Sequence, residues 1–538
     1  MKKRALFSVY DKNGIIDLAS FLVESGWEIL STGGTARYLQ EHAIPVTDVA
    51  TITGFPECLD GRVKTLHPAI HAGLLARRDN PSHLETLAKQ GFTLIDLVCV
   101  NLYPFFEKVQ AGLSLEETIE FIDIGGPTIL RAAAKNYRDV VILTERGDYE
   151  EVIAGLKAGT VPEAFRRRLA AKVFDLTAAY DAAVARYFLD EAYPAYWPLS
   201  LKKVQSLRYG ENGHQTAALY FYTDQSGALT AMEQLHGKVM GYNNIRDLDL
   251  AWKTACAFGL SSDGIGSLGE ADVARLLPDI GPFPPVCCVA VKHNTPCGIA
   301  LGATLEEAYT KTYTGDPVSI FGGIVACNVP VNAVVAKRLA ALFLEIIVAP
   351  DFDAEALEIL KAKKDLRIIK APKAPREQQE CISVDGGLLV QDANHRLLEK
   401  WEVVTKAMPD PADIPDLIFG MRAVAYVKSN AVVVVKNRAA VGIGGGETNR
   451  IWAAELALSR SARRIAVEAE SGAGDGSPAR VLASDAYFPF PDVVDVAAAA
   501  GITTIVQPGG STNDNLSVEA CNRLGLAMVF TGIRHFKH

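Results

Sequence analysis

The heptapeptide KHNTPCG, residues 292–298, brings together residue types that can move protons. It directly follows the apolar run 286–291, which has the composition of a buried strand. A charged side chain at the end of such a strand is costly unless it pairs or takes part in a reaction, so Lys292 and His293 are a candidate catalytic pair. An imidazole accepts a proton near neutral pH, and an ammonium group stabilises an oxyanion or delivers a proton. The alternative is a histidine whose hydrogen bonds are satisfied in the core.

A zinc-dependent deaminase is a competing interpretation of this run, because Pro296-Cys297 is similar to the PCxxC signature of those enzymes. Position 300 is alanine, however, so the second cysteine is missing. The nine cysteines are scattered and form no CxxC pair, which is typical of reduced thiols rather than of a zinc or redox site. The sequence therefore predicts that the protein binds no metal.

Polar clusters follow three apolar stretches in the first part of the chain, at residues 10–12 (YDK), 32–35 (TGGT) and 101–104 (NLYP). The TGGT segment precedes a helix-like stretch, so its main-chain N–H groups and the helix N-terminus suit a phosphate. The alternative is a tight strand-to-helix turn in which Thr35 is the N-cap. Neither GK[ST] nor GxGxxG is present here, which argues against a P-loop and a dinucleotide fingerprint.

Two further segments of the first part are rich in polar residues, GRVKTLHPAIHAG (61–73) and IDIGGPTILRAAAKNY (122–137). His67 and His71 have the spacing of a helical zinc pair, but Pro68 lies between them and favours structural histidines. Asp123 precedes a predicted helix and Lys135 lies towards its end, where a plain ion pair between them is the alternative to a site. The other candidates of these segments are Arg62, Lys64, Thr65 and Gly125.

The elements that must position these residues alternate between short apolar strands and amphipathic helices from about residue 5 to residue 141. That alternation predicts a parallel sheet, within about residues 1–145, that is covered by helices and binds ligands at the carboxyl ends of its strands. The three polar clusters are therefore expected to face one crevice. Residues 150–189 have helical spacing, and the prolines of AYPAYWPLS end it, so a domain boundary is predicted near residue 198.

The second part of the chain also mixes strands with helices, which predicts another α/β region. Strands are expected over VCCVAVKH, IFGGIVACN, AVVVVKNRAAVGI, TTIVQPGG and AMVFTGIRHF. The segment KAPKAPREQQE, 370–380, is expected to be an exposed connection between two halves. The loop LRYGENGHQ, 207–215, can bind an anion, with a surface turn as the alternative.

Length and composition limit the class of protein. At 538 residues the chain exceeds what one hydrophobic core usually serves, which predicts at least two domains. The apolar share of 49% and the charged share of 22% are ordinary for a globular protein, and no apolar run reaches the roughly 18 residues of a membrane-spanning helix. The first apolar stretch spans about five residues, too short for a secretory signal, so a cytoplasmic location is expected. The net charge of −9 argues against a general nucleic-acid coat.

In order and interval, YDK, TGGT, RVKTLHP, NLYPF, DIGG and AAAKN resemble the inosine monophosphate (IMP) cyclohydrolase domain of the bifunctional purine biosynthesis enzymes, whose fold is similar to methylglyoxal synthase. The resemblance implies ring closure of formylaminoimidazole carboxamide ribonucleotide (FAICAR) in this crevice. By matching positions, Lys135 is expected to transfer protons, Lys64 and Tyr103 to donate hydrogen bonds, and Asp123 to orient the amide. The residues expected to hold the phosphate and ribose are Tyr10, Asp11, Lys12, Thr32, Gly33, Gly34, Thr35, Arg62, Thr65, Asn101 and Gly125.

KHNTPCG, with FGGIVACN, VKSNAVVVVKN, GIGGGETNR, SDAYFPFPD, PGGST and TGIRHF, is similar to the aminoimidazole carboxamide ribonucleotide (AICAR) transformylase of the same family. The resemblance implies that His293 is the base and that Lys292 acts beside it. Glu345, Tyr487 and Thr512 stand where some members carry Asp, Phe and Ala. The expected nucleotide contacts are Arg208, Tyr209, Gly322, Glu345, Asn430, Arg450, Asp492 and Arg534, and the expected folate contacts are Ile451, Tyr487, Ser511 and Thr512.

The resemblance covers nearly the whole chain. It implies a methylglyoxal-synthase-like domain over residues 1–198, followed by a larger cytidine-deaminase-like α/β transformylase region over 199–538, built of two halves. It also implies the last two steps of IMP synthesis, with 10-formyltetrahydrofolate as co-substrate, and a homodimer whose transformylase sites lie at the subunit interface. The alternatives are a methylglyoxal-synthase-like lyase fused to a deaminase-like domain, and a non-catalytic nucleotide-binding regulator.

Overall fold

The computed structural model describes residues 2–59, 61–103, 105–224, 226–260, 267–281, 283–471 and 476–538. Pro104 of the NLYP cluster lies outside them. By its internal contacts the chain divides into a first unit, up to Val204 with Tyr220–Ser226, and a second unit, Gln205–Leu219 with Gly227–His538. The assignment of one activity to each side of residue 198 stays a prediction.

The first unit contains a five-stranded parallel sheet, in the order β3-β2-β1-β4-β5, which confirms the predicted sheet type. Its strands bury both faces, since Ala5 and Phe7 pack on one side and Leu6 on the other. The third strand was not predicted, because its three residues carry no apolar alternation. The bounds are β1 Arg4–Ser8, β2 Glu28–Ser31, β3 Val46–Asp48, β4 Leu97–Val100 and β5 Val141–Leu143.

Helices cover both faces of this sheet. The single helix expected over 150–189 is two helices, because Gly159, at a φ of +96°, and Pro162 interrupt it. The bounds are α1 Ile15–Glu24, α2 Gly33–Glu41, α3 Val49–Thr53, α4 Pro68–Leu75, α5 Pro81–Gln90, α6 Phe105–Gln110, α7 Leu115–Ile119, α8 Gly125–Lys135, α9 Tyr149–Lys157 and α10 Glu163–Phe188.

The second unit is built on a twelve-stranded mixed sheet. Its order is β16-β21-β20-β19-β17-β18-β10-β9-β11-β12-β13-β8. The expected strand over AVVVVKNRAAVGI is instead the hairpin β17–β18, which turns at residues 437–438. The bounds are β8 Glu233–His236, β9 Val286–Lys292, β10 Thr295–Gly302, β11 Ile324–Cys327, β12 Ile346–Ala349, β13 Arg367–Lys370, β16 Glu402–Val403, β17 Val432–Lys436, β18 Ala439–Gly444, β19 Val481–Ser484, β20 Thr504–Gln507 and β21 Ala527–Phe530.

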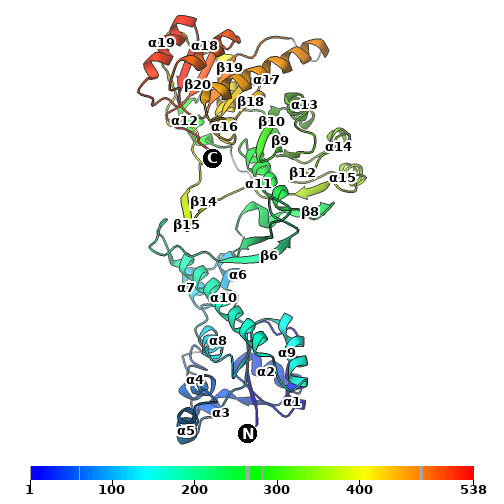
Figure 1. Cartoon of the computed structure of the whole chain (residues 1–538), viewed down its shortest axis with the longest axis vertical. Coiled ribbons are helices and arrows are strands. Elements are labelled where there is room, and N and C mark those ends of the chain that lie inside the picture. The colour runs from blue at the N-terminus through cyan, green and yellow to red at the C-terminus, as the bar shows by residue number, and fades with distance from the viewer. Residues whose placement is uncertain are drawn as a thin grey trace. The chain divides into compact units, whose positions relative to one another are not determined.

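This sheet is an internal repeat about the β18–β10 pair. We call residues 233–370 the first half and 402–530 the second half. Each runs strand, helix, hairpin, helix and then three strands alternating with two helices, and the first half has an additional helix, Glu270–Leu276, before its hairpin. In Figure 1, α13, α14 and α15 accompany the green first half, and α17, α18 and α19 the orange and red second half. The helix bounds are α11 Tyr242–Cys256, α12 Glu270–Leu276, α13 Leu305–Gly315, α14 Ala333–Ala340, α15 Ala354–Lys361, α16 Ile414–Val424, α17 Arg450–Ser471, α18 Asp492–Ala499 and α19 Asp514–Leu524.

The two halves share one core on one face of the sheet. Trp252 of α11 and Met421 of α16 pack there with Val289 and Val433, while the neighbouring strand residues face separate clusters under the other helices. Two small sheets lie outside the large one. They pair β6 Leu201–Leu207 with β7 Ala217–Tyr222, and β14 Gln379–Val384 with the antiparallel β15 Gly387–Asp392 between the two halves. None of the described helices is long and apolar enough to span a membrane.

Candidate active sites

In the first unit, the loops after β1, β2 and β4 leave adjacent parallel strands at the same edge. Asn101 ties two of these loops together. Its Oδ1 accepts the N–H groups of Tyr10 at 2.6 Å and Asp11 at 3.0 Å, and its Nδ2 donates to the Asp11 carbonyl at 2.9 Å. The rings of Tyr10 and Tyr103 meet edge to face, with centroids 5.7 Å apart. The YDK and NLYP clusters therefore form one wall of a site.

The TGGT segment forms the start of α2. Thr32 is the residue before the helix and its side chain makes no capping bond, so the interpretation of Thr35 as N-cap is wrong. The buried Thr35 hydroxyl instead donates to the Val9 carbonyl at 3.0 Å and accepts the Val9 N–H at 3.1 Å. This pair of bonds fastens the helix start to the residue that follows β1. Gly33 has a φ of +57°, and the exposed Gly34 leaves open space beside the helix start.

Lys64 lies over this turn. A Cβ added at Gly33 would be 3.3 Å from the Lys64 Nζ, and one at Gly61 would be 2.8 Å from it. The ammonium group also pairs with Glu57 at 3.3 Å. A cation beside a helix N-terminus forms a local positive field that suits an anionic group. Glu57 was not predicted, because it belongs to none of the motifs.

Asp123 is held at the start of α8. Its carboxylate accepts the Gly126 N–H at 2.8 Å and the Tyr103 N–H. Burial raises the pKa of Asp123, and these two hydrogen bonds oppose that rise. A Cβ at Gly126 would lie 2.5 Å from the carboxylate, so only glycine fits there, and one at Gly125 would lie 3.2 Å from the Thr65 hydroxyl. Asp123, Tyr103, Thr65 and Gly125 are thus brought together.

Lys135 is not brought to this group within one chain. It is the last residue of α8 and is exposed, whereas Gly125 is the first. At 1.5 Å per residue, α8 places their Cα atoms about 15 Å apart, towards opposite edges of the sheet. A role of Lys135 in proton transfer stays a prediction from the resemblance, and the helix geometry of one chain gives it no support.

The remaining candidates of the first unit contact protein groups near this edge. Arg62 forms an exposed ion pair with Glu120. Lys12 donates to the Tyr10 carbonyl at 3.4 Å. His67 is the N-cap of α4, where its Nδ1 accepts the Ala69 N–H at 3.1 Å, as expected of a structural histidine.

In the second unit, Lys292 ends β9 and Thr295 begins β10, so His293 and Asn294 form a two-residue hairpin turn. Their φ values are +54° and +55°, as in a type I′ turn. Lys292 Nζ donates to the Phe321 carbonyl at 2.7 Å. The carboxylate of Asp247, on α11, accepts the N–H groups of both turn residues. Asp247 was not predicted, because it lies 46 residues before His293 in a helix without a catalytic motif.

Gly322 and Glu345 lie beside this turn, since β9 and β11 are antiparallel and the end of β9 meets the start of β11. Gly322, at a φ of +73°, donates its N–H to the Phe343 carbonyl at 2.7 Å, and a Cβ there would be 3.8 Å from Lys292 Nζ. Glu345 forms an ion pair with Arg367 at 2.7 Å. It stands where some relatives carry Asp and stays a predicted nucleotide contact.

The loop that bears Arg208 and Tyr209 contacts α11, the helix that carries Asp247. The guanidinium of Arg208 stacks over the Tyr209 ring at 5.7 Å, and both side chains are exposed. Glu211 of this loop pairs with Arg246 at 3.2 Å, and Arg246 precedes Asp247 in the helix. The first half thus gathers Lys292, His293, Gly322 and Glu345, and the loop with Arg208 and Tyr209 is joined to it through Glu211 and Arg246.

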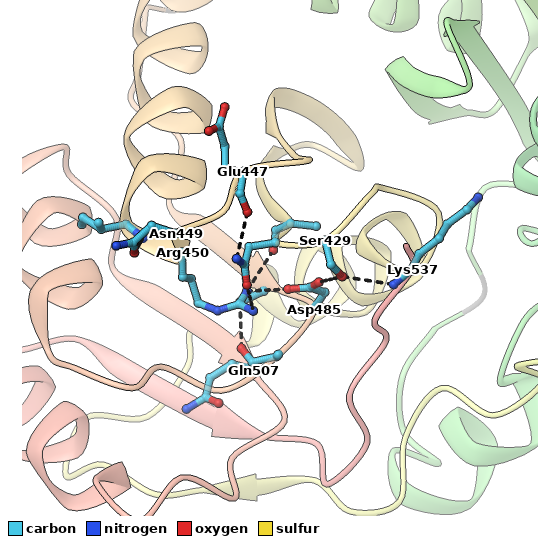
Figure 2. Close-up of polar contacts among 12 residues, drawn as sticks. Ser429, Glu447, Asn449, Arg450, Asp485, Gln507 and Lys537 are labelled. Atoms are coloured by element: carbon cyan, nitrogen blue, oxygen red, sulfur yellow. Dashed lines mark hydrogen bonds and ion pairs between the residues drawn. The ribbon is translucent and has the colours of Figure 1, made fainter. Parts of the chain in front are cut away.

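A second group is centred on Arg450, which is 5% exposed (Figure 2). Its guanidinium pairs with Asp485, donates to the Ser484 hydroxyl at 2.8 Å and donates to Asn430 Oδ1 at 2.7 Å. Asn430 in turn donates from Nδ2 to the Glu447 carbonyl at 2.9 Å. Arg450 therefore positions Asn430, and its own direct contact with a nucleotide stays a prediction.

The carboxyl-terminal tail is tied to the same network. Ser429 donates its N–H to the Lys537 carbonyl at 2.8 Å, and its hydroxyl accepts the Lys537 N–H at 3.1 Å and bonds to Asp485, as Figure 2 shows. The imidazole of the buried His535 contacts Asn394 at 2.9 Å and the Leu397 carbonyl at 3.1 Å. These contacts hold the exposed Arg534 at the edge of the second half.

The other predicted contacts follow the carboxyl ends of β19 and β20 or begin the adjoining helices. Ser511 Oγ accepts the Asn513 N–H at 3.1 Å, and Asn513 donates to the Pro489 carbonyl at 3.2 Å, which joins the two loops. Tyr487 is 37% exposed. The members of this group are Asn430, Arg450, Ile451, Tyr487, Asp492, Ser511, Thr512 and Arg534.

Both groups lie at one edge of the sheet but on different strands. The pairing of Ala300 with Ala439 places the start of β10 beside the end of β18, so the His293 turn and Asn430 share an edge. In the strand order, β17, which follows Asn430, lies two strand spacings of about 4.8 Å from β10, or roughly 10 Å. The two groups therefore occupy neighbouring parts of one edge. Among the described residues, no three His, Cys, Asp or Glu side chains gather as metal ligands.

Comparison with known proteins gives full-length relatives. A family model described as AICARFT/IMPCHase bienzyme matches residues 133–460, and one described as MGS-like domain matches residues 14–128, in agreement with the predicted methylglyoxal-synthase-like start. The bifunctional purine biosynthesis protein PurH of Clostridium botulinum (strain Kyoto / Type A2) is 53% identical over 539 residues, and that of Clostridium perfringens (strain SM101 / Type A) is 52% identical over 541 residues; each match covers 100% of both chains. The crystal structure of ForH, 38% identical, covers 35% of this chain and 100% of its own, with a TM-score of 0.32.

Proposed function

Because the chain belongs to the AICARFT/IMPCHase bienzyme family, we propose that the crevice of the first unit closes the purine ring and that the His293 turn of the second unit transfers the formyl group. The protein is an AICAR formyltransferase and an IMP cyclohydrolase. It catalyses the last two steps of IMP synthesis, in which formylation of AICAR gives FAICAR and dehydrative ring closure gives IMP. The co-substrate is of the folate type, and we assign it as 10-formyltetrahydrofolate.

Formyl transfer forms a C–N bond between the AICAR amine and the formyl carbon and breaks the bond from that carbon to the folate nitrogen. The amine is conjugated to an electron-poor imidazole ring, so it must lose a proton as it attacks. His293 takes that proton, because its neutral imidazole accepts near neutral pH. Lys292, ordered by its bond to the Phe321 carbonyl, donates to the tetrahedral oxyanion or to the departing nitrogen.

Ring closure joins the FAICAR carboxamide nitrogen to the formyl carbon and expels water. The nitrogen is a weak nucleophile, so stabilisation of the developing oxyanion supplies much of the acceleration. Lys64 and the exposed Tyr103 provide donors, and Asp123 orients the amide. The start of α2 and Lys64 suit the phosphate, with Asn101 fixing the loop that bears Tyr10 and Asp11.

The placement of the two groups in the second unit bears on the assembly. A nucleotide and a folate that meet at Lys292 and His293 need contacts from both groups, which lie on different strands of the sheet. As the resemblance implies, we propose that two copies form a homodimer in which the first half of one copy faces the second half of the other. Small-molecule substrates, rather than nucleic acid or membrane, are the proposed partners, in the cytoplasm.

The observation that carries the proposal is the placement of Lys292 and His293 on one turn, with Lys292 at a glycine-lined edge. The test follows tetrahydrofolate release and IMP formation from AICAR and 10-formyltetrahydrofolate. Pure, folded protein that turns over neither substrate would contradict it.

A pair of lysine variants tests the crevice with supplied FAICAR. Lys64→Met is expected to lower the cyclisation rate by about 10²- to 10³-fold, because it removes a preorganised donor, while formyl transfer stays unchanged. Lys135→Met is the matched variant: a rate loss of similar size would show that Lys135 reaches a cyclisation site, as the resemblance implies. An unchanged rate in Lys64→Met would contradict the assignment of this crevice.

A further inference from the structure

The turn that carries His293 is held by a carboxylate from a separate helix. Asp247 Oδ2 accepts the His293 N–H at 3.2 Å, and Oδ1 accepts the Asn294 N–H at 2.5 Å. Both turn residues have left-handed backbone angles without being glycine, and such angles cost free energy in residues with a side chain. The carboxylate stabilises this strained backbone, because both N–H groups reach it only when the turn keeps this shape.

We propose that Asp247 is a positioning residue for formyl transfer, one that fixes the main chain from which the His293 side chain projects. The inference rests on the proposed function of His293. The residue before His293, Lys292, is held by the bond of its side chain to the Phe321 carbonyl. Burial raises the pKa of Asp247 and the two N–H groups oppose that rise, consistent with a carboxylate retained for its hydrogen bonds.

The second half contains the same arrangement without a histidine. Asp416 of α16 accepts the N–H groups of Asn437 at 2.8 Å and Arg438 at 2.6 Å, and those residues have φ values of +53° and +55°. Burial also raises the pKa of Asp416. A substitution at Asp416 therefore perturbs an equivalent turn of the same sheet, and it serves as a matched control for structural damage.

The test compares Asp247→Asn with Asp416→Asn in the full-length protein. An asparagine offers one acceptor and turns a donor towards the second N–H, so it loosens the turn at nearly constant volume. Asp247→Asn is expected to lower kcat for formyl transfer by about 10- to 100-fold, the effect of misplacing a catalytic group by about 1 Å. The KM for AICAR is expected to change by less than about threefold, and cyclisation of FAICAR to stay unchanged. Asp247→Asn and Asp416→Asn are expected to lower the melting temperature by similar amounts. Asp416→Asn is expected to leave kcat at the wild-type value.

A second substitution separates positioning from folding. Glycine adopts a positive φ without strain, so Asn294→Gly in the Asp247→Asn background is expected to recover a measurable part of kcat. The inference is overturned if Asp247→Asn retains the wild-type kcat, if Asp416→Asn loses as much, or if Asn294→Gly restores nothing. Wild-type protein that transfers no formyl group would contradict the proposed function instead.

Discussion

The two halves of the second unit have the same architecture and different chemistry. In each, a helix supplies an aspartate that holds a left-handed hairpin turn after a strand ending in lysine, Lys292 in the first half and Lys436 in the second. The first turn presents an imidazole, and the second presents Asn437 and Arg438. Lys292 donates to a carbonyl beside Gly322, whereas Lys436 donates to the Ser477 carbonyl at 2.8 Å.

The contrast shows that the turn is a structural feature of the fold, and that catalysis depends on which side chains it carries. The second half instead contains a buried polar network around Arg450 and Asp485, and this network positions Asn430 and the carboxyl-terminal tail. In the proposed function, the first half supplies proton transfer and the second half supplies binding contacts. Three comparisons test this division.

The largest expected effect is a loss of formyl transfer on substitution in the turn that carries His293. His293→Ala is expected to lower formyl transfer by about 10³- to 10⁴-fold, because it removes the proposed general base. Cyclisation of supplied FAICAR is expected to stay unchanged, since its proposed site lies in the other unit. Steady-state rates with each substrate measure both effects.

Asn437→Gly is the matched control, because glycine tolerates the positive φ of the equivalent turn. It is expected to leave formyl transfer at the wild-type rate. Comparable losses in the two variants would show that the halves do not differ in the way described, and loss of cyclisation in a folded His293→Ala protein would contradict two separate sites.

The next largest effect is expected from substitutions in two ion pairs, one buried and one partly exposed. Arg450→Met leaves Asp485, whose side chain is fully buried, without its partner, and is expected to destabilise the second unit by about 3–5 kcal/mol. Arg367→Met in the first half leaves Glu345, which is 37% exposed and can reach water, and is expected to cost about 1 kcal/mol. Urea unfolding followed by a probe in the second unit measures both, and equal losses would contradict the buried network.

Much of the fold is contained in local sequence patterns. Alternation of apolar strands with amphipathic helices sufficed to predict the parallel sheet of the first unit, and hence the common edge of the loops after β1, β2 and β4. The end of an apolar run located Lys292 and His293 at a strand terminus. These features depend on residues that are neighbours in sequence, and so they are visible in it.

Features that depend on distant residues were not predicted. Asp247 lies on a helix far from the turn it holds, and the hairpin at Asn437-Arg438 lacks the glycine that usually marks one. Lys135 follows the DIGG motif closely in sequence, yet the rise of α8 carries it to the other end of the helix. Arg450 is of a residue type that often contacts anionic ligands. Only the fold shows that its guanidinium is bonded to Asp485 and Asn430.

The smallest effect concerns the carboxyl-terminal tail, which is bonded to Ser429 and places Lys537 near Lys253 of α11. Burial, reinforced by the nearby Lys253 ammonium, lowers the pKa of Lys537 from its ordinary value to about 8. In the unfolded chain the group keeps its ordinary pKa of about 10.4, so between pH 8 and 10 the unfolded state binds more protons than the folded state. The free energy of unfolding contributed by Lys537 therefore rises with pH over this interval. Urea unfolding of wild-type protein and Lys537→Met at pH 7.5 and 9.5 is expected to show a gain in the wild type relative to the variant. A difference that stays constant or falls would mean that the folded protein does not lower the pKa of Lys537.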